Sequence, residues 1–209
     1  MENNPMLKHV AEKRLYVYSE YHDSVSCYVH YIGYFHDRIK FEDAELIARL
    51  YLALAPRKTN ATLAFYPFDN KEWESVSHGK WQLNSQKTFH RSGWLNKPKD
   101  RLWLVGSPLE DDFLPGALKF AWNISANETV LLIPTIEADL EYLLKNFQDD
   151  FETNPENEFR LINHYDNIFS RGHDGFCFRV FSKTVDGTHV LNSLRNISDY
   201  PVLEKQKPL

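Results

Sequence analysis

The chain has 209 residues, of which 43% are hydrophobic, 25% are charged and only eight are glycine. This composition is typical of a globular protein and argues against extensive disorder. The net charge of −5 at pH 7 argues against a surface that is basic throughout, which general binding to nucleic acids or anionic membranes requires.

The first residues and the apolar runs indicate a cytoplasmic location. The N-terminal sequence MENNPMLKHVAEKRLYVYSE lacks the uninterrupted apolar stretch of a signal peptide. No segment approaches the roughly 20 apolar residues that a membrane span needs. Cys27 and Cys177 each lie in an apolar run, so we expect buried, reduced thiols rather than a disulfide. We therefore expect a cytoplasmic protein that does not associate with membranes.

Two β-rich segments, 14–19 and 24–35, predict a hairpin with its turn at residues 20–23. Successive side chains on a strand point to opposite faces, so the second segment has two different faces. The more apolar face should lie on the core and carries Val25, Cys27, Val29, Tyr31 and Phe35. The other face carries tyrosines together with His30 and His36, which suits a ligand or a partner. The alternative, which we favour, is a face covered by a helix with the tyrosine hydroxyls reaching solvent.

The later segments predict an alternation of helices and strands. Residues 41–56 predict a buried helix, because acids occupy the first turn, leucines recur at helical spacing and Pro56 ends the run. Apolar spacing predicts further helices at 136–151, 158–170 and 188–197. Strands are predicted at 60–68, 101–106, 128–134 and 175–185.

These elements follow one another without a regular βαβ rhythm, and the opening hairpin is antiparallel. We therefore predict an α+β fold, with one domain over residues 1–200 and a mixed, largely antiparallel sheet packed with three to four helices. Residues 70–100 are polar and irregular, which is typical of a long loop or an inserted subdomain. Residues 201–209 are expected to form a flexible tail.

Histidine and aspartate are densest in NHYDNIFSRGHDGFCFRV, residues 163–180. If 158–170 is helical, His164 lies near Arg160 and Arg171 on the solvent side, where an anion could bind. His164 and Asp166 would point about 200° apart around that helix and could not share a metal ion. We therefore predict no metal and no cofactor.

His173 and Asp174 in the same stretch lie in a turn between two glycines, where an Asp ordinarily bonds to its own backbone. A phosphoester hydrolase would use His164, His173 and Asp174, with an arginine holding the anion. The alternative, which we favour, is a helix end, a turn and a buried strand without catalysis. Arg179, inside FCFRVF, should be partly buried beside a carboxylate or carbonyl group.

Charge is distributed unevenly along the chain. Between Glu137 and Glu158 eight acids accompany one base, and the acids gather at a predicted helix end and loop in Asp149, Asp150, Glu152 and Glu156. Such a surface would steer a basic partner. Residues 78–101 are basic and aromatic, and Lys80 and Arg91 there could bind phosphates. A charge run is otherwise only a solvated surface.

Signatures of nucleophilic catalysis and phosphate binding are missing: the sequence contains no G-x-S-x-G, no G-x-G-x-x-G and no P-loop. We therefore expect a protein-binding module rather than an enzyme, with an acidic recognition surface for a basic protein. An immunity-type inhibitor of a nuclease toxin fits this description. A His/Asp hydrolase and a nucleic-acid or nucleotide binder acting through residues 78–101 are the alternatives.

Overall fold

The computed structural model describes residues 13–35, 39, 43–55, 60–67, 82–92, 95–106, 113–135, 161–171 and 177–205. Its elements in chain order are β1 (Leu15–His22), β2 (Cys27–Tyr34), α1 (Ala44–Leu54), β3 (Asn60–Pro67), β4 (Gln82–Ser92), β5 (Leu95–Gly106), α2 (Phe113–Ile124), β6 (Ser125–Thr135), β7 (Asn167–Arg171), β8 (Cys177–Ser182), α5 (Gly187–Ile197) and β9 (Val202–Glu204). The predicted α+β fold is confirmed.

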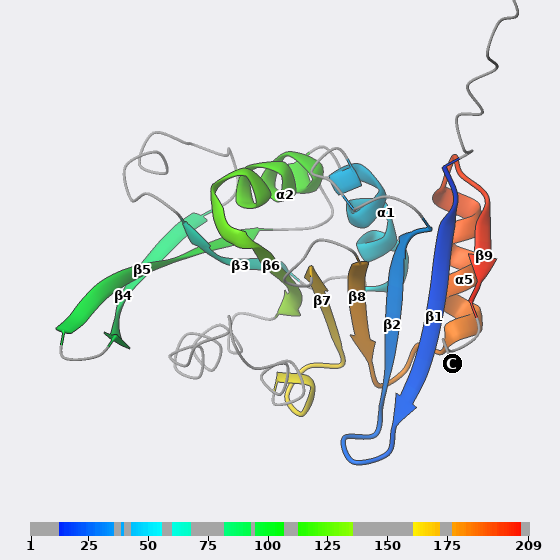
Figure 1. The fold of residues 1–209 in the computed structure, drawn as a ribbon, viewed down its shortest axis with the longest axis horizontal. Helices are drawn as coiled ribbons and strands as arrows, with labels where there is room; N and C mark the ends of the chain where they lie inside the picture. The colour runs from blue at the N-terminus through cyan, green and yellow to red at the C-terminus, as the bar shows by residue number, and fades with distance from the viewer. Residues whose placement is uncertain are drawn as a thin grey trace, which may run out of the picture.

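The described strands form one sheet in the order β4-β5-β3-β6-β7-β8-β2-β1-β9 (Figure 1). β9 runs parallel to β1, whereas the other neighbouring strands are antiparallel, so the sheet is mixed. β5 pairs with β3 only over residues 102–106, and its first part pairs with β4 alone among the described strands. The β4–β5 hairpin therefore extends beyond the rest of the sheet as a two-stranded ribbon.

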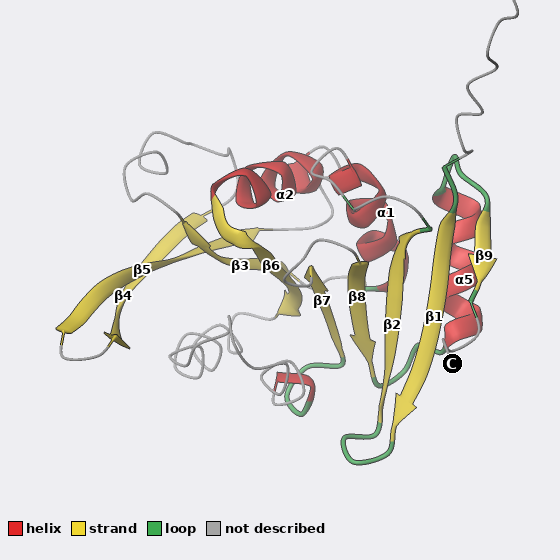
Figure 2. Cartoon of the chain, in the orientation of Figure 1, coloured by secondary structure: helices red, strands yellow, loops and turns green. Residues whose placement is uncertain are grey.

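Helices α1, α2 and α5 pack on the same face of the sheet (Figure 2). Their buried side chains meet those of β1, β2, β7 and β8 in the larger of two hydrophobic clusters. Tyr51 of α1 is fully buried there, and its ring lies edge-on to Phe169 of β7 at 5.1 Å between centroids. This cluster anchors the ends of α1 and α5, between which the candidate site lies.

The opposite face of the sheet carries a smaller hydrophobic cluster, which includes Cys27, Val29 and Phe181. Leu161, Ile162 and Tyr165 cover it. The sequence assigned the core to this side of β2, and Cys27 and Val29 are indeed fully buried here, although Phe35 is exposed. The larger cluster lies on the other side, with Ile32 and Tyr34, so both sides of β2 face a hydrophobic cluster.

The predicted opening hairpin is confirmed, but its turn lies three residues later than expected. β1 continues to His22, which pairs with Cys27, so the turn comprises residues 23–26. The amide of Ser26 donates to the carbonyl of Asp23, and Ser26 itself has a φ of 48°. Cross-strand pairing and not the polarity of residues 20–23 decides where β1 ends.

The predicted helix at 41–56 is confirmed as α1, but the sequence did not predict α2. Its FLPGALKFAW contains Pro115 and Gly116, which read as helix breakers. Pro115 is the third residue of α2, where the backbone amide needs no partner within the helix. Pro115 and Gly116 therefore lie in the first turn of α2, where they do not interrupt the helix.

The predicted helix over 158–170 is wrong at its C-terminal half, because Asn167–Arg171 forms β7 between β6 and β8. Ile162 and Tyr165 lie in the smaller cluster and Phe169 lies in the larger one, on the opposite face of the sheet. The helical spacing of these residues is therefore coincidental. Ladder hydrogen bonds to two strands outweigh the local pattern.

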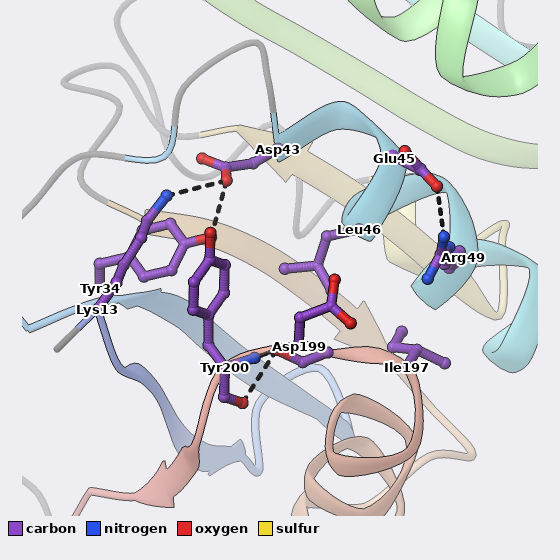
Figure 3. Close-up of a pocket in the computed structure, with 10 residues that line it drawn as sticks. Lys13, Tyr34, Asp43, Glu45, Leu46, Arg49, Ile197, Asp199 and Tyr200 are labelled. Carbon is purple, nitrogen blue, oxygen red and sulfur yellow. Dashed lines mark hydrogen bonds and ion pairs between the residues drawn. The ribbon is translucent and has the colours of Figure 1, made fainter.

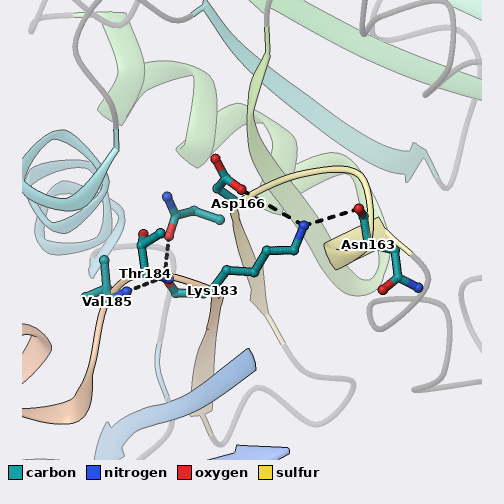
Figure 4. A network of polar contacts seen from close by, with 7 residues as sticks. Asn163, Asp166, Lys183, Thr184 and Val185 are labelled. Carbon is teal, nitrogen blue, oxygen red and sulfur yellow. Dashed lines mark hydrogen bonds and ion pairs between the residues drawn. The ribbon is translucent and has the colours of Figure 1, made fainter. Parts of the chain in front are cut away.

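Buried polar contacts join β7 to β8 and to the loop that follows (Figure 4). The Ser182 hydroxyl donates to the Asn167 side-chain carbonyl at 2.6 Å and accepts from the Val185 amide at 2.9 Å. On the surface, the Lys183 ammonium donates to the carbonyl of Asn163 at 3.2 Å and lies 4.0 Å from an Asp166 carboxylate oxygen. These contacts fix the loop that leads into α5.

Two further segments differ from the sequence-based expectation. Residues 202–204 were expected to belong to a flexible tail, but they form β9, in which Val202 is buried beside Leu15. Within 70–100, β4 and the first part of β5 form the ribbon. The predicted helix at 136–151 lies outside the described residues. None of the helices in the described part of the chain has the length and apolar run that crossing a membrane requires.

Candidate functional site

A surface pocket of about 220 Å³ lies where the N-terminal half of α1 meets the C-terminal end of α5. We call it the Lys13 pocket. It is lined by Lys13, Tyr34, Asp43, Glu45, Leu46, Arg49, Ile197, Ser198, Asp199 and Tyr200. The residues come from four separate parts of the chain, which the sheet and the two helices bring together (Figure 3).

The ammonium group of Lys13 occupies one end of this pocket. Its nitrogen lies 3.9 Å from the ring centroid of Tyr34 and 5.2 Å from that of Tyr200. It also donates to Asp43 Oδ1 at 3.3 Å. Two aromatic faces and one carboxylate are the groups that bind an organic cation best. We call Tyr34, Tyr200 and Asp43 the ammonium cage.

The ammonium cage is held by groups other than Lys13. The Tyr34 hydroxyl donates to Asp43 Oδ1 at 2.7 Å, and both residues are buried, with 4% and 8% of their surface exposed. The Tyr200 ring meets Tyr34 edge-on, at 5.9 Å between centroids. The Tyr200 amide donates to the Ser198 hydroxyl, which in turn donates to the Tyr200 carbonyl. The cage geometry is therefore set by β2, by the residue before α1 and by the turn after α5.

The other end of the pocket carries further charges. Arg49 is hydrogen-bonded to Glu45 one turn earlier in α1, as expected for an i, i+4 pair. Asp199 faces the space between them and Tyr200 and is exposed to solvent (Figure 3). Leu46 and Ile197 supply apolar walls. Three carboxylates thus face two cations, and the pocket favours a positively charged ligand.

A second polar cluster surrounds Glu20 on the face of the sheet away from the helices. The Glu20 carboxylate accepts hydrogen bonds from the Tyr18 hydroxyl at 3.0 Å, the Tyr31 hydroxyl at 2.8 Å and the His22 ring at 2.9 Å. Burial raises the pKa of Glu20, but these three bonds outweigh burial and hold it below its usual value. Burial and the bond to Glu20 raise the pKa of Tyr31. Each side-chain oxygen of Glu20, Tyr18 and Tyr31 already takes part in a hydrogen bond within this cluster. We therefore interpret the cluster as a structural feature of the sheet.

His30 lies on a covered part of its sheet face, as the favoured interpretation predicted. It is fully buried, and its Nε2 donates to the carbonyl of Val185, in the loop before α5, at 2.9 Å. Because a carbonyl oxygen only accepts, Nδ1 is the unprotonated nitrogen and accepts from the Ser19 hydroxyl at 2.8 Å. The hydroxyl of Tyr34, on the same face, does not reach solvent but binds Asp43. His36 lies outside the described residues.

The structure tests little of the predicted His/Asp site. His164 lies in an exposed turn before β7, with its ring edge-on to Tyr165. It does not share a helix face with Arg171, because Arg171 belongs to β7. His173, Asp174 and Arg160 lie outside the described residues, so the hydrolase hypothesis remains a prediction. Arg179 is half-buried as expected, and its guanidinium donates to the Ser170 hydroxyl at 3.4 Å.

The predicted partner-binding acids Asp149, Asp150, Glu152 and Glu156 lie outside the described residues, as does Lys80. Arg91 lies on β4. Among the described residues, no group of three or more His, Cys, Asp or Glu could hold a metal ion. Both cysteines are free thiols, Cys27 buried and Cys177 half-buried.

Sequence reasoning placed Tyr34 on a sheet face that suits a ligand, but it missed Asp43 and Tyr200, the other two residues of the ammonium cage. Lys13 and Tyr200 stand near opposite ends of the chain, and no spacing rule joins them. The parallel pairing of β9 with β1 brings these two ends together. Comparisons with protein-family models, with curated proteins and with solved structures find no match to this chain.

Proposed function

We propose that the protein is a protein-binding module whose partner is a basic protein that docks at the Lys13 pocket. One observation carries the proposal: the pocket already holds an ammonium group against two tyrosine rings and a carboxylate. Tyrosine is enriched among the residues that dominate binding energy at protein interfaces. Tyr200 and Asp199 are exposed at the pocket and available to a partner.

Charge supports the choice of a basic partner. The pocket presents Asp43, Glu45 and Asp199 against Lys13 and Arg49, and the whole chain carries a net charge of −5. The acidic run between Glu137 and Glu158, which we predict from the sequence to be a recognition surface, would add to the negative electrostatic potential that attracts a basic partner. Complementary charge of this kind speeds association and selects partners. In its most specific form the proposal is an immunity-type inhibitor that neutralises a basic nuclease toxin.

Charge reversal in the pocket tests the proposal. The pocket variant carries Glu45→Lys and Asp199→Lys, and the matched control carries Asp23→Lys and Glu204→Lys, which lie at exposed positions outside the pocket. The probe is a ten-residue lysine peptide, with binding measured by calorimetry at several salt concentrations. We expect the pocket variant to bind at least tenfold more weakly than the wild type and the control to change by twofold or less. Equal losses would mean that only the net charge matters.

Affinity capture from the native host then identifies the partner. Wild type, pocket variant and control are used side by side, and retained proteins are identified by mass spectrometry. The proposal requires a basic protein that the wild type and the control retain and the pocket variant loses.

The backbone of the β4–β5 ribbon favours nucleic acid as a second candidate ligand. Residues at alternate positions of a strand share a face, so positions 97, 99 and 101 of β5 lie on one face, opposite 90, 88 and 86 of β4. These positions of β5 are Lys, Lys and Arg, and the same face holds no acid. A two-stranded ribbon fits the major groove of B-DNA.

Salt dependence tests this second candidate. A variant with Lys97, Lys99 and Arg101 changed to Gln should bind a 20-base-pair duplex more weakly. Each lost phosphate contact should reduce the slope of log K against log salt by about 0.9. Lys119→Gln, on an exposed position of α2, serves as control. A slope that is the same in all three proteins excludes the ribbon as the binding element.

A further inference from the structure

The ammonium cage is already occupied by a residue of the chain itself. The ammonium group of Lys13 makes cation–π contacts to two rings and one charge-assisted hydrogen bond. These are the contacts that any primary alkylammonium could make. The cage therefore recognises a chemical group, and Lys13 is its tethered ligand.

Lys13 stands outside the elements that hold the cage. It precedes β1, which begins at Leu15, and 31% of its side chain is exposed. Asp43 and Tyr34 stay linked by their own hydrogen bond. Ser198 holds the backbone of Tyr200, and the Tyr200 ring packs edge-on against Tyr34. Removal of the Lys13 side chain would thus leave the two rings and the carboxylate in place.

The pocket beside the cage has room for the alkyl part of such a ligand. Its volume is about 220 Å³, and Leu46 and Ile197 form apolar walls. Among the described lining residues, the carboxylates of Asp43, Glu45 and Asp199 outnumber the cations even with Lys13 present, and removal of Lys13 would increase this excess. This excess of negative charge would favour the binding of another cation in the cage in place of Lys13.

We propose that the Lys13 pocket is a receptor for a primary alkylammonium group, and that Lys13 is an internal occupant which a lysine side chain of the partner displaces. The inference rests on the proposed function for the identity of the displacing group. A tethered ligand competes at a high effective concentration. Displacement therefore requires a partner with further contacts, and isolated amines should not bind the wild type.

Chemical rescue of Lys13→Ala tests the proposal in the full-length chain. The probe is n-butylammonium chloride, with sodium chloride at the same ionic strength and n-butanol as controls. At several times its Kd the amine should raise the thermal midpoint of Lys13→Ala by about 2–4 °C. It should leave the wild type unchanged. The double variant Lys13→Ala/Tyr200→Ala should lose the effect.

Lys183 offers a matched control. Its side chain is also 31% exposed and lies beside an aspartate, Asp166. Unlike Lys13, it makes no cation–π contact within the described part of the chain. Lys183→Ala should therefore gain no stability from butylammonium. The proposal is overturned if the amine stabilises both variants equally, or stabilises Lys13→Ala no more than sodium chloride does. If Lys13→Ala fails to fold, Lys13→Gln is used, and NMR shifts of the two tyrosine rings replace the thermal readout.

Two amines then separate the possible sources of the ammonium group. Nα-acetyl-lysine amide represents a protein side chain, and putrescine represents a free diamine. Binding of the lysine derivative to Lys13→Ala supports a protein lysine as the natural occupant, whereas binding of putrescine alone overturns it. Because these measurements use no partner protein, butylammonium rescue can succeed even where the decalysine and capture experiments fail, and the two proposals are tested separately.

Discussion

The hydroxyl of Ser19 and Nδ1 of His30 lie 2.8 Å apart, on paired positions of β1 and β2. On its other side the same ring donates to the carbonyl of Val185. A fully buried imidazole thus joins the hairpin to the loop before α5 and has a defined tautomer. Its hydrogen bonds suit the neutral ring, which gives the protein a predictable pH dependence.

Stability should fall as the pH drops below 6.5. Burial lowers the pKa of His30 from 6.5 to about 4, although the bond to Val185 and the charge of Asp186 partly oppose burial. Below pH 6.5 the unfolded chain therefore binds a proton that the folded protein does not. The free energy of unfolding should decrease by up to about 1.4 kcal/mol per pH unit between pH 6.5 and 4.

Urea unfolding at pH 7, 6 and 5 measures this slope. His30→Gln keeps a donor for Val185 but does not titrate, so its slope over this range should be smaller than that of the wild type. Identical slopes in the two proteins would assign the pH dependence to other groups.

Gly187, the first residue of α5, should tolerate no side chain. A Cβ there would lie 2.7 Å from Ser19 Oγ and 2.9 Å from Ser19 Cβ. We expect Gly187→Ala to lower the free energy of unfolding by about 1–3 kcal/mol through this overlap. Ser19→Gly removes both clashing atoms, so the double variant should lose less than the sum of the single losses.

Gly116 in α2 is the control for that substitution. A Cβ at Gly116 would meet nothing within 4 Å. Gly116→Ala should therefore stabilise the protein by roughly 0.5–1 kcal/mol, as alanine does at unobstructed helical positions. Similar destabilisation by both substitutions would contradict the packing of α5 against β1.

Asp186 should contribute to the stability of α5 as its N-cap. Its carboxylate accepts from the amide of His189 at 2.8 Å. Asp186→Ala should reduce the free energy of unfolding by about 1 kcal/mol, and Asp186→Ser should recover most of the loss because serine caps almost equally well. Thermal melts at pH 8, where His30 remains neutral in both states, measure the cap separately from the histidine.

Removal of the Ser182 hydroxyl should destabilise the loop before α5. In Ser182→Ala the side-chain carbonyl of Asn167 and the amides of Thr184 and Val185 each lose a partner. Leaving buried groups unsatisfied costs about 1–3 kcal/mol. Amide hydrogen exchange should show faster exchange at Val185 than in the wild type. Unchanged protection there would mean that another group holds this amide.

Local patterns in the sequence predicted the elements whose signals lie close together in the chain. The β1–β2 hairpin, α1, β8 and α5 follow from strand-forming residues, helical spacing and an ending proline. The α+β class followed from their order. These elements are determined locally because each has its own apolar side and a clear start or stop.

The tertiary structure decided what local patterns could not. β7 has helical spacing but pairs with two strands, and β9 forms from a polar tail because it completes the edge beside β1. The ammonium cage has no sequence signature, because its residues are far apart in the chain. Tyr200 comes close to Tyr34 and to the occupant Lys13 when β9 pairs beside β1. Hydrogen bonds between distant strands outweigh local preference, and a site built from residues far apart in the chain exists only once those bonds form.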